Sequence, residues 1–250
     1  MVDYLYDGTF EGLLTCIYHN YYSEPAAGIY EKDRYQFSML SRCCEICCDE
    51  KKAGRVYRAI REKISDDDLK RIYKIFASSS EKRENIILEY IKLGFIKGHS
   101  VSLMHGDPAV FAAQSAEQKV NAEIHRFKGL LRFSALANQV LYSRVEPDSD
   151  ILEFLAPHFC SRFSGEAFMI HDVSRSKALI SSSGCWYISD FFQKEVPLLA
   201  ENEKDFRSLW KNYFDTAAIS QRTNPRCQKR FMPVRYWKHL TEMQTGSGVL

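Results

Sequence analysis

The sequence has no apolar run that approaches the roughly 20 residues needed to cross a bilayer, so it predicts no transmembrane helix. Its first residues, MVDYLYDGTF, lack the basic stretch followed by an apolar stretch that marks an export signal. No internal repeat or low-complexity segment interrupts the chain. We therefore expect a cytoplasmic globular protein that has no membrane partner.

Sequence signatures of the common enzyme classes are absent as well. The chain contains no P-loop, no GxGxxG, no GxSxG and no HExxH. These absences count against P-loop nucleotide hydrolases, dinucleotide-dependent enzymes, serine hydrolases of the α/β class and zinc proteases. They leave enzymes in general open, and they predict no cofactor.

Cysteine is comparatively frequent, with eight in the chain. Four of them form one cluster, Cys43, Cys44, Cys47 and Cys48. Cys44 and Cys47 have the CxxC spacing found in zinc and iron–sulfur sites. A structural zinc site normally needs a second ligand pair, and no further CxxC or HxxxH lies nearby. We predict reduced thiols in a loop without a metal, while metal binding at this cluster stays open as the alternative.

The first part of the chain, residues 1–105, is predicted to be mainly helical after a short opening strand. Apolar residues at helical spacing predict helices over 49–63 and 81–96 and a third that begins after Ser65. Residues 23–50 show no clear periodicity, which indicates a loop with a short strand near Tyr35–Met39. Another helix is predicted before this loop, with Thr9 as its N-cap.

The pattern changes at Gly129, after a long helix that begins at Asp107-Pro108. Strands and one helix then follow in the order β-β-α-β-β-β, which predicts an α+β fold with an antiparallel sheet and flanking helices. The strands are predicted at 130–137, 139–145, 167–172, 177–181 and 185–188, and helices at 151–163 and 203–218. We expect an α+β domain over 106–243 and a disordered tail over 244–250.

The segment Gln221–Leu240 carries six basic residues and no acid. The formal net charge of the whole chain is only +2, so positive charge is concentrated here. Arg and Lys neutralise phosphates and aromatic faces stack on bases, so this composition favours a nucleic-acid partner. The alternative is a solvated basic surface without a ligand.

Eight basic side chains and two aromatic ones are predicted to form the nucleic-acid interface. The basic residues are expected to contact phosphates, and the aromatic residues to stack on bases. The candidates are Arg126, Lys128, Arg132, Arg162, Arg175, Arg222, Arg226 and Arg235, with Tyr236 and Trp237 as the aromatic pair.

Three further residues are candidates for acid–base chemistry: His158, His171 and Asp172. A histidine that titrates near neutrality suits proton transfer. His171 and Asp172 are consecutive in a predicted strand, so they point to opposite faces and cannot ligate one ion together without a bulge. Asp172 is also expected to accept hydrogen bonds from the turn that follows it. The catalytic interpretation requires all three groups to meet in one cleft.

Seven segments of the chain together carry a resemblance to a known family. They are Tyr4–Leu13, Tyr90–Phe95, Arg126–Phe133, Ala156–Phe163, Ile170–Asp172, Arg222–Gln228 and Met232–Trp237. In order and spacing they resemble a family of bacterial proteins of DNA metabolism that is defined by a domain of unknown function, and the similarity runs through nearly the whole chain.

The resemblance implies an association with a radical-SAM protein of DNA repair or modification, and in some members a fusion to a uracil-DNA glycosylase domain. This chain has neither the CxxxCxxC run of a radical-SAM enzyme nor a glycosylase motif, so neither activity is assigned to it. We predict a DNA-binding protein of DNA metabolism or repair that acts with such a partner. The alternatives are a nucleic-acid-processing enzyme that uses His158, His171 and Asp172, and an interaction module without DNA affinity.

Overall fold

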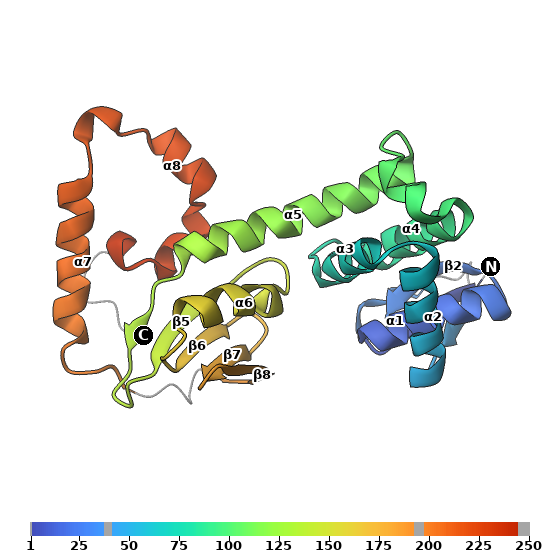
Figure 1. The fold of residues 1–250 in the computed structure, drawn as a ribbon, viewed down its shortest axis with the longest axis horizontal. Coiled ribbons are helices and arrows are strands. Elements are labelled where there is room, and N and C mark those ends of the chain that lie inside the picture. The colour runs from blue at the N-terminus through green and yellow to red at the C-terminus, as the bar shows by residue number, and fades with distance from the viewer. Residues whose placement is uncertain (1, 38–41, 193–197, 245–250) are drawn as a thin grey trace. The chain divides into compact units, whose positions relative to one another are not determined.

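The computed structural model describes residues 2–37, 42–192 and 198–244. The chain forms two compact units, Met1–Val120 and Asn121–Leu250 (Figure 1). Helix α5 (Pro108–Leu130) contributes residues to both, and the boundary expected near residue 105 falls just before it. Apart from Gln244, the tail expected to be disordered lies outside the described residues.

A three-stranded parallel sheet opens the first unit. Strand β1 (Val2–Tyr6) lies between β2 (Ala26–Glu31) and β3 (Arg42–Glu45). Both neighbours run parallel to β1, and α1 (Phe10–Tyr22) provides the crossover that parallel strands need.

Of this sheet, the sequence predicted the short opening strand, which is confirmed as β1, but not its pairing with two parallel neighbours. The strand expected near Tyr35–Met39 is wrong for Tyr35–Phe37, which are irregular and follow the short 3-10 helix η1 (Lys32–Arg34). The remainder of that expected strand lies outside the described residues.

The predicted helices of this unit are confirmed as α1, α2 (Glu50–Lys63), α3 (Asp66–Ala77) and α4 (Arg83–Lys97). Thr9 caps α1, because its hydroxyl accepts a hydrogen bond from Gly12 N at 3.0 Å. Ser65 caps α3 in the same way. The chain leaves α4 at Gly98, whose φ of +61° favours glycine, and continues as the 3-10 helix η2 (Gly98–Leu103).

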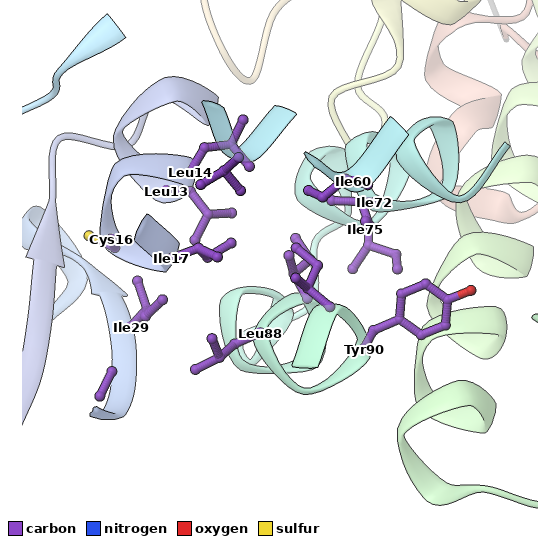
Figure 2. Close-up of a cluster of buried hydrophobic side chains, with 14 of the residues drawn as sticks. Leu13, Leu14, Cys16, Ile17, Ile29, Ile60, Ile72, Ile75, Leu88 and Tyr90 are labelled. Atoms are coloured by element: carbon purple, nitrogen blue, oxygen red, sulfur yellow. The ribbon is translucent and has the colours of Figure 1, made fainter. Parts of the chain in front are cut away.

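One hydrophobic core joins the helices α1 to α4 of the first unit with strands β1 and β2. Figure 2 shows side chains from α1, β2, α2, α3 and α4 directed toward a common interior. Leu13, Ile17, Ile72 and Leu88 belong to this core, and all four are essentially without solvent contact. Burial of this many apolar side chains stabilises the unit far more than helix propensity does.

A polar network lies at the edge of this core. The buried Asp68 carboxylate accepts hydrogen bonds from the Ser65 hydroxyl at 2.6 Å and from the Tyr90 hydroxyl at 2.5 Å, and it pairs with Arg71. Arg71 also pairs with Glu117 at 2.7 Å. The network therefore ties α3 to α4 and to the first part of α5.

A five-stranded sheet forms the centre of the second unit. Its order is β4-β5-β6-β7-β8, and it includes one parallel pair, β5 with β6. The strands are β4 (Ser134–Ala135), β5 (Leu141–Val145), β6 (Phe168–Asp172), β7 (Lys177–Ser182) and β8 (Cys185–Asp190).

The expected α+β class is confirmed, whereas the sheet is mixed rather than wholly antiparallel. The physical reason is helix α6 (Leu152–Arg162), which carries the chain from β5 back to the start of β6 and so makes that pair parallel. The strand expected over 130–137 shrinks to β4, because α5 continues to Leu130.

Helix α6 covers one face of this sheet. The Phe159 ring lies 6.4 Å from the Phe168 ring, and Cys160 Sγ lies 3.6 Å from Ser181 Oγ. Phe168 and Ser181 are paired across β6 and β7, so both belong to this α6 face. Side chains alternate along a strand, which places Asp172 on the α6 face and His171 on the opposite face.

The last part of the chain leaves the sheet, and its end returns to α7, the helix with which it begins. It consists of α7 (Glu203–Ala217), α8 (Pro225–Phe231) and three 3-10 helices, η4 (Ser220–Arg222), η5 (Val234–His239) and η6 (Thr241–Met243), drawn in orange and red in Figure 1. Lys211 Nζ donates to the Gln244 carbonyl at 2.9 Å and so ties the end of this excursion to α7. Within the described ranges, no helix has the length and hydropathy needed to cross a membrane.

Candidate nucleic-acid interface

The segment from the second half of α7 to the end of α8, which we call the C-terminal arm (residues 211–231), is mostly exposed. Every residue from Gln221 to Phe231 is exposed. Asn224 caps α8 by accepting a hydrogen bond from Cys227 N at 3.0 Å, and Pro225 starts the helix. Four basic side chains project from this part of the arm: Arg222, Arg226, Lys229 and Arg230.

No ion pair of these four cations is found among the described residues, in contrast to most other basic side chains of the chain. Aromatic rings accompany the charges, since Tyr213 and Phe231 are 64% and 67% exposed. The arm therefore combines uncompensated positive charge with accessible rings, and the nucleic-acid contacts expected of Arg222 and Arg226 stay a prediction.

A buried clamp holds the base of the arm. The side chain of Glu242 is 1% exposed and accepts hydrogen bonds from Arg132 Nη2 at 2.6 Å and from Trp210 Nε1 at 2.9 Å. The Arg132 guanidinium also lies 5.2 Å from the Trp210 ring centre. Burial pushes the pKa of Glu242 upward, but the hydrogen bonds from Arg132 and Trp210 outweigh it and leave the pKa lowered.

The clamp corrects the role expected for Arg132. Its guanidinium is engaged inside the unit by Glu242 and by the Gly129 and Leu131 carbonyls, so it is not available to a phosphate. The sequence analysis did not single out Glu242. A single acid that follows a basic run carries no specific signal.

Arg175 is likewise committed to internal contacts. It donates to the Asp172 carboxylate at 2.8 Å and to the Pro147 and Asp148 carbonyls. Arg235 is half exposed but pairs with the Asp148 carboxylate at 2.6 Å and donates to the Tyr236 hydroxyl. Both residues were expected to contact phosphates, and both are instead partly neutralised by neighbouring acids.

Tyr236 is not an open stacking surface, contrary to expectation. It is 2% exposed, its ring meets Phe127 edge-on at 4.8 Å, and its hydroxyl donates to Glu123 at 3.1 Å. The physical reason is that burial of a large aromatic ring stabilises the fold, whereas an exposed ring contributes no such stabilisation. Trp237 is half-buried and donates to the Met232 carbonyl at 2.8 Å.

Of the other predicted basic residues, Lys128 and Arg162 lie near His158. Lys128 and Arg162 are exposed, and Arg126 is half-buried. Burial lowers the pKa of His158, and the charges of Lys128 and Arg162 lower it further, which places these three side chains in one neighbourhood. We call Lys128, at the end of α5, and Arg162, in α6, the second basic cluster.

The three acid–base candidates do not meet in one site. His171 is buried on the opposite face of the sheet, where its Nδ1 lies 2.7 Å from the Tyr142 hydroxyl. His158 belongs to α6, on the other side. Asp172 accepts hydrogen bonds from Ser174 N and Arg175 N, which confirms the expected turn cap. The geometry therefore lacks the common cleft that the catalytic interpretation requires.

A pH-dependent stability should follow from His171. Burial and the charge of Arg144 lower its pKa below the ordinary value of 6.5, although a hydrogen bond with the Phe191 backbone opposes them. A histidine with a lowered folded-state pKa contributes stability that is present above pH 6.5 and is lost as pH falls through the folded pKa. We expect the free energy of unfolding, measured by urea titration, to decrease from pH 7 to pH 5, with this group contributing at most about 1.4 kcal/mol per pH unit.

The variant His171→Gln should show a weaker fall over the same pH range, because glutamine retains a hydrogen-bond acceptor for Tyr142 and does not titrate. His158 and His239 also have lowered pKa values, caused first by burial, so only the difference between the two proteins reports His171. Identical pH profiles would contradict the assignment.

The cysteine cluster divides between a strand and a turn. Cys43 and Cys44 belong to β3, and Cys47 and Cys48 lie exposed between β3 and α2. All four are free thiols. In the described ranges no group of three or more histidine, cysteine or acidic side chains is arranged to hold a metal ion.

Comparison with known proteins gives one match. Residues 81–242 match a family described as a domain of unknown function, DUF4130. The matched range includes the C-terminal arm, the clamp and the second basic cluster. No curated protein and no solved structure matches the chain.

Proposed function

The chain belongs to the DUF4130 family, and we propose that it binds DNA through the C-terminal arm and serves in DNA metabolism or repair. The observation that carries the proposal is the set of four exposed cations on the arm without an acidic neighbour in the Gln221–Leu240 run. Each cation that replaces a condensed counterion at a phosphate contributes affinity at low salt.

The arrangement of the arm supports a backbone-binding mode. Side chains that fan out from a short helix and its flanking turns can follow a phosphate chain without reading base edges. Exposed Tyr213 and Phe231 offer ring faces on which unpaired bases can stack. The proposal therefore favours binding that depends little on sequence and strongly on salt.

The second basic cluster adds Lys128 and Arg162 as further phosphate contacts in this proposal. Both are exposed, and the charges of both lower the pKa of His158. Arg126, which is half-buried, is kept as a predicted phosphate contact, whereas Arg132, Arg175 and Tyr236 are not. We do not propose acid–base catalysis by His158, His171 and Asp172, because these groups lie on different sides of the sheet.

A partner protein is part of the proposal. The resemblance suggests a radical-SAM or glycosylase partner, and α7 carries a surface that such a partner could cover. Phe206, Leu209 and Tyr213 recur at helical spacing and are each more than half exposed. An interaction module without DNA affinity is the second candidate function, and this apolar stripe is the observation that favours it.

Replacing Arg222, Arg226, Lys229 and Arg230 together with alanine should weaken DNA binding more than about tenfold at low salt. The slope of log affinity against log salt should become shallower by about 3 to 4, because close to one counterion is released per phosphate contact on duplex DNA. Fluorescence anisotropy with labelled single- and double-stranded oligonucleotides over a salt series measures both quantities.

A matched control removes four exposed cations of the first unit: Lys51, Lys82, Lys97 and Lys119. It changes the net charge by the same amount, so it separates a local interface from general electrostatic attraction. Equal losses in the two variants would contradict the arm as the interface. Absence of binding by the natural sequence at low salt would overturn DNA binding and leave the interaction module.

A further inference from the structure

A cavity of about 680 Å³ lies in the first unit among α1, α2 and α4. Its size falls in the range of small-molecule binding sites. Four aromatic rings line it, and basic side chains surround them. The aromatic residues are Tyr18, Tyr21, Tyr22 and Phe95.

The rings form an ordered stack rather than a loose apolar patch. Tyr18 and Tyr22 are one helical turn apart on α1, with ring centres 4.4 Å apart and planes inclined by 22°. The Arg55 guanidinium lies 5.3 Å and 5.5 Å from the two ring centres, and its Nη1 donates to the Tyr18 hydroxyl at 3.3 Å. These contacts hold the stack in place.

The outer end of the stack is accessible. Tyr22 is 66% exposed, although a tyrosine ring in a folded protein would gain from burial. Tyr21 meets Phe95 edge-on at 5.6 Å on the other side of the cavity. A planar aromatic ligand that enters from solvent therefore finds a ring face to extend the stack and an aromatic wall beside it.

The charge of the cavity selects among planar ligands. Arg55, Arg58 and Lys63 line it, against one acid, Glu62, which gives a formal lining charge of +2. Lys63 Nζ lies 6.0 Å from the Phe95 ring centre, and both arginines are exposed. An uncharged aromatic ligand would leave this positive charge uncompensated, and a simple inorganic anion would leave the stacked rings unused.

We propose that this cavity binds a nucleotide, with the base stacked on Tyr22 and the phosphate placed among Arg55, Arg58 and Lys63. The site goes beyond the proposed function of the arm, since it lies in the other unit and shares no residue with it. The shared chemistry, a base with a 5′-phosphate, can come from a free nucleotide or from an unpaired nucleotide of a strand.

The test uses the full chain that carries the four alanine substitutions in the arm, so that the arm does not contribute. We expect 2′-deoxyadenosine 5′-monophosphate to bind saturably in isothermal titration calorimetry. Tyr22→Ala should weaken this binding about tenfold, in keeping with the loss of one stacking contact. Deoxyadenosine without the phosphate should bind more weakly, as should the monophosphate to Arg58→Ala.

The matched control is Tyr57→Ala. Tyr57 is also an exposed tyrosine, at 43%, and lies on α2 beside Val56 and Arg58 but does not line the cavity. Its replacement should leave binding unchanged. Circular dichroism of each variant confirms that the helices remain folded.

The two sources are separated by a short oligo(dA). Tighter binding of the oligonucleotide than of the monophosphate would assign the site to a strand, and equal binding would assign it to a free nucleotide. Either result supports the site. No saturable binding of the monophosphate, or equal losses in Tyr22→Ala and Tyr57→Ala, would overturn it. Because the arm lacks its four cations in this test, failure of the nucleotide site and failure of the arm proposal are distinguishable.

Discussion

Replacing Glu242 with alanine is expected to lower the free energy of unfolding of the second unit by about 3 kcal/mol. The carboxylate is buried and is the common acceptor for Arg132 and Trp210. Its removal leaves the Arg132 guanidinium, whose side chain is only 23% exposed, without its charge partner. Losing one member of a buried ion pair costs more than the pair contributes, because the remaining charge stays desolvated.

Tryptophan fluorescence during urea unfolding measures this effect directly. All three tryptophans, Trp186, Trp210 and Trp237, belong to the second unit, and Trp210 is part of the clamp. The spectrum of the folded variant should also shift, since Trp210 loses its hydrogen bond.

The control for the clamp is Asp150→Ala. Asp150 pairs with Lys177 at 3.6 Å, and both side chains are about two-fifths exposed. Pairs of this kind contribute about 0–1 kcal/mol. Were Glu242→Ala to cost no more than this control, the buried clamp would have to be abandoned as the anchor of the arm.

The second large effect is expected at Asp68 in the first unit. Asp68→Ala should destabilise this unit by about 3–5 kcal/mol, because Arg71 and the Tyr90 hydroxyl lose their shared acceptor inside the protein. The alanine also removes the acceptor for the Ser65 hydroxyl at the start of α3. Far-UV circular dichroism, read beside tryptophan fluorescence, separates this loss from changes in the second unit.

Tyr90→Phe is the matched control within the same network. It removes one hydroxyl and leaves the Asp68–Arg71 ion pair in place, so we expect a loss of about 1 kcal/mol. Equal destabilisation by the two substitutions would mean that the ion pair contributes little, and that the hydroxyl alone accounts for the network.

Local chemistry made the helices of this protein predictable. Thr9 and Ser65 could be identified as caps because each hydroxyl directly precedes a segment with helical periodicity, where it can accept a hydrogen bond from a free backbone N–H of the first turn. The structure confirms both caps. The parallel sheet of the first unit could not be predicted in this way. Strand β2 has neither alternation nor a turn signal, and its pairing with β1 depends on residues more than twenty positions apart.

On the functional surfaces, too, local features could be predicted from the sequence, whereas contacts between distant residues could not. The exposure of the cations on the arm could be predicted from composition. The sequence around Asn224-Pro225 contains no acid, so these side chains have no neighbouring carboxylate with which to form an ion pair. The engagement of Arg132 with Glu242 does not, because the two residues are 110 positions apart in the sequence. The cavity was missed for a similar reason: Tyr22, Arg55 and Phe95 lie on three separate helices, and each alone resembles an ordinary surface residue.

The hydrophobic core of the first unit extends beyond the segment that matches the family. The family match starts at residue 81, yet this core is built from both sides of that position: Leu13 and Ile72 precede it, while Leu88 and Tyr90 follow it. A relative that inherited only the matched segment would carry α4 with its apolar side chains uncovered, and would need another set of helices to enclose them. In this chain the segment that matches the family and the segment that folds as a unit therefore have different bounds.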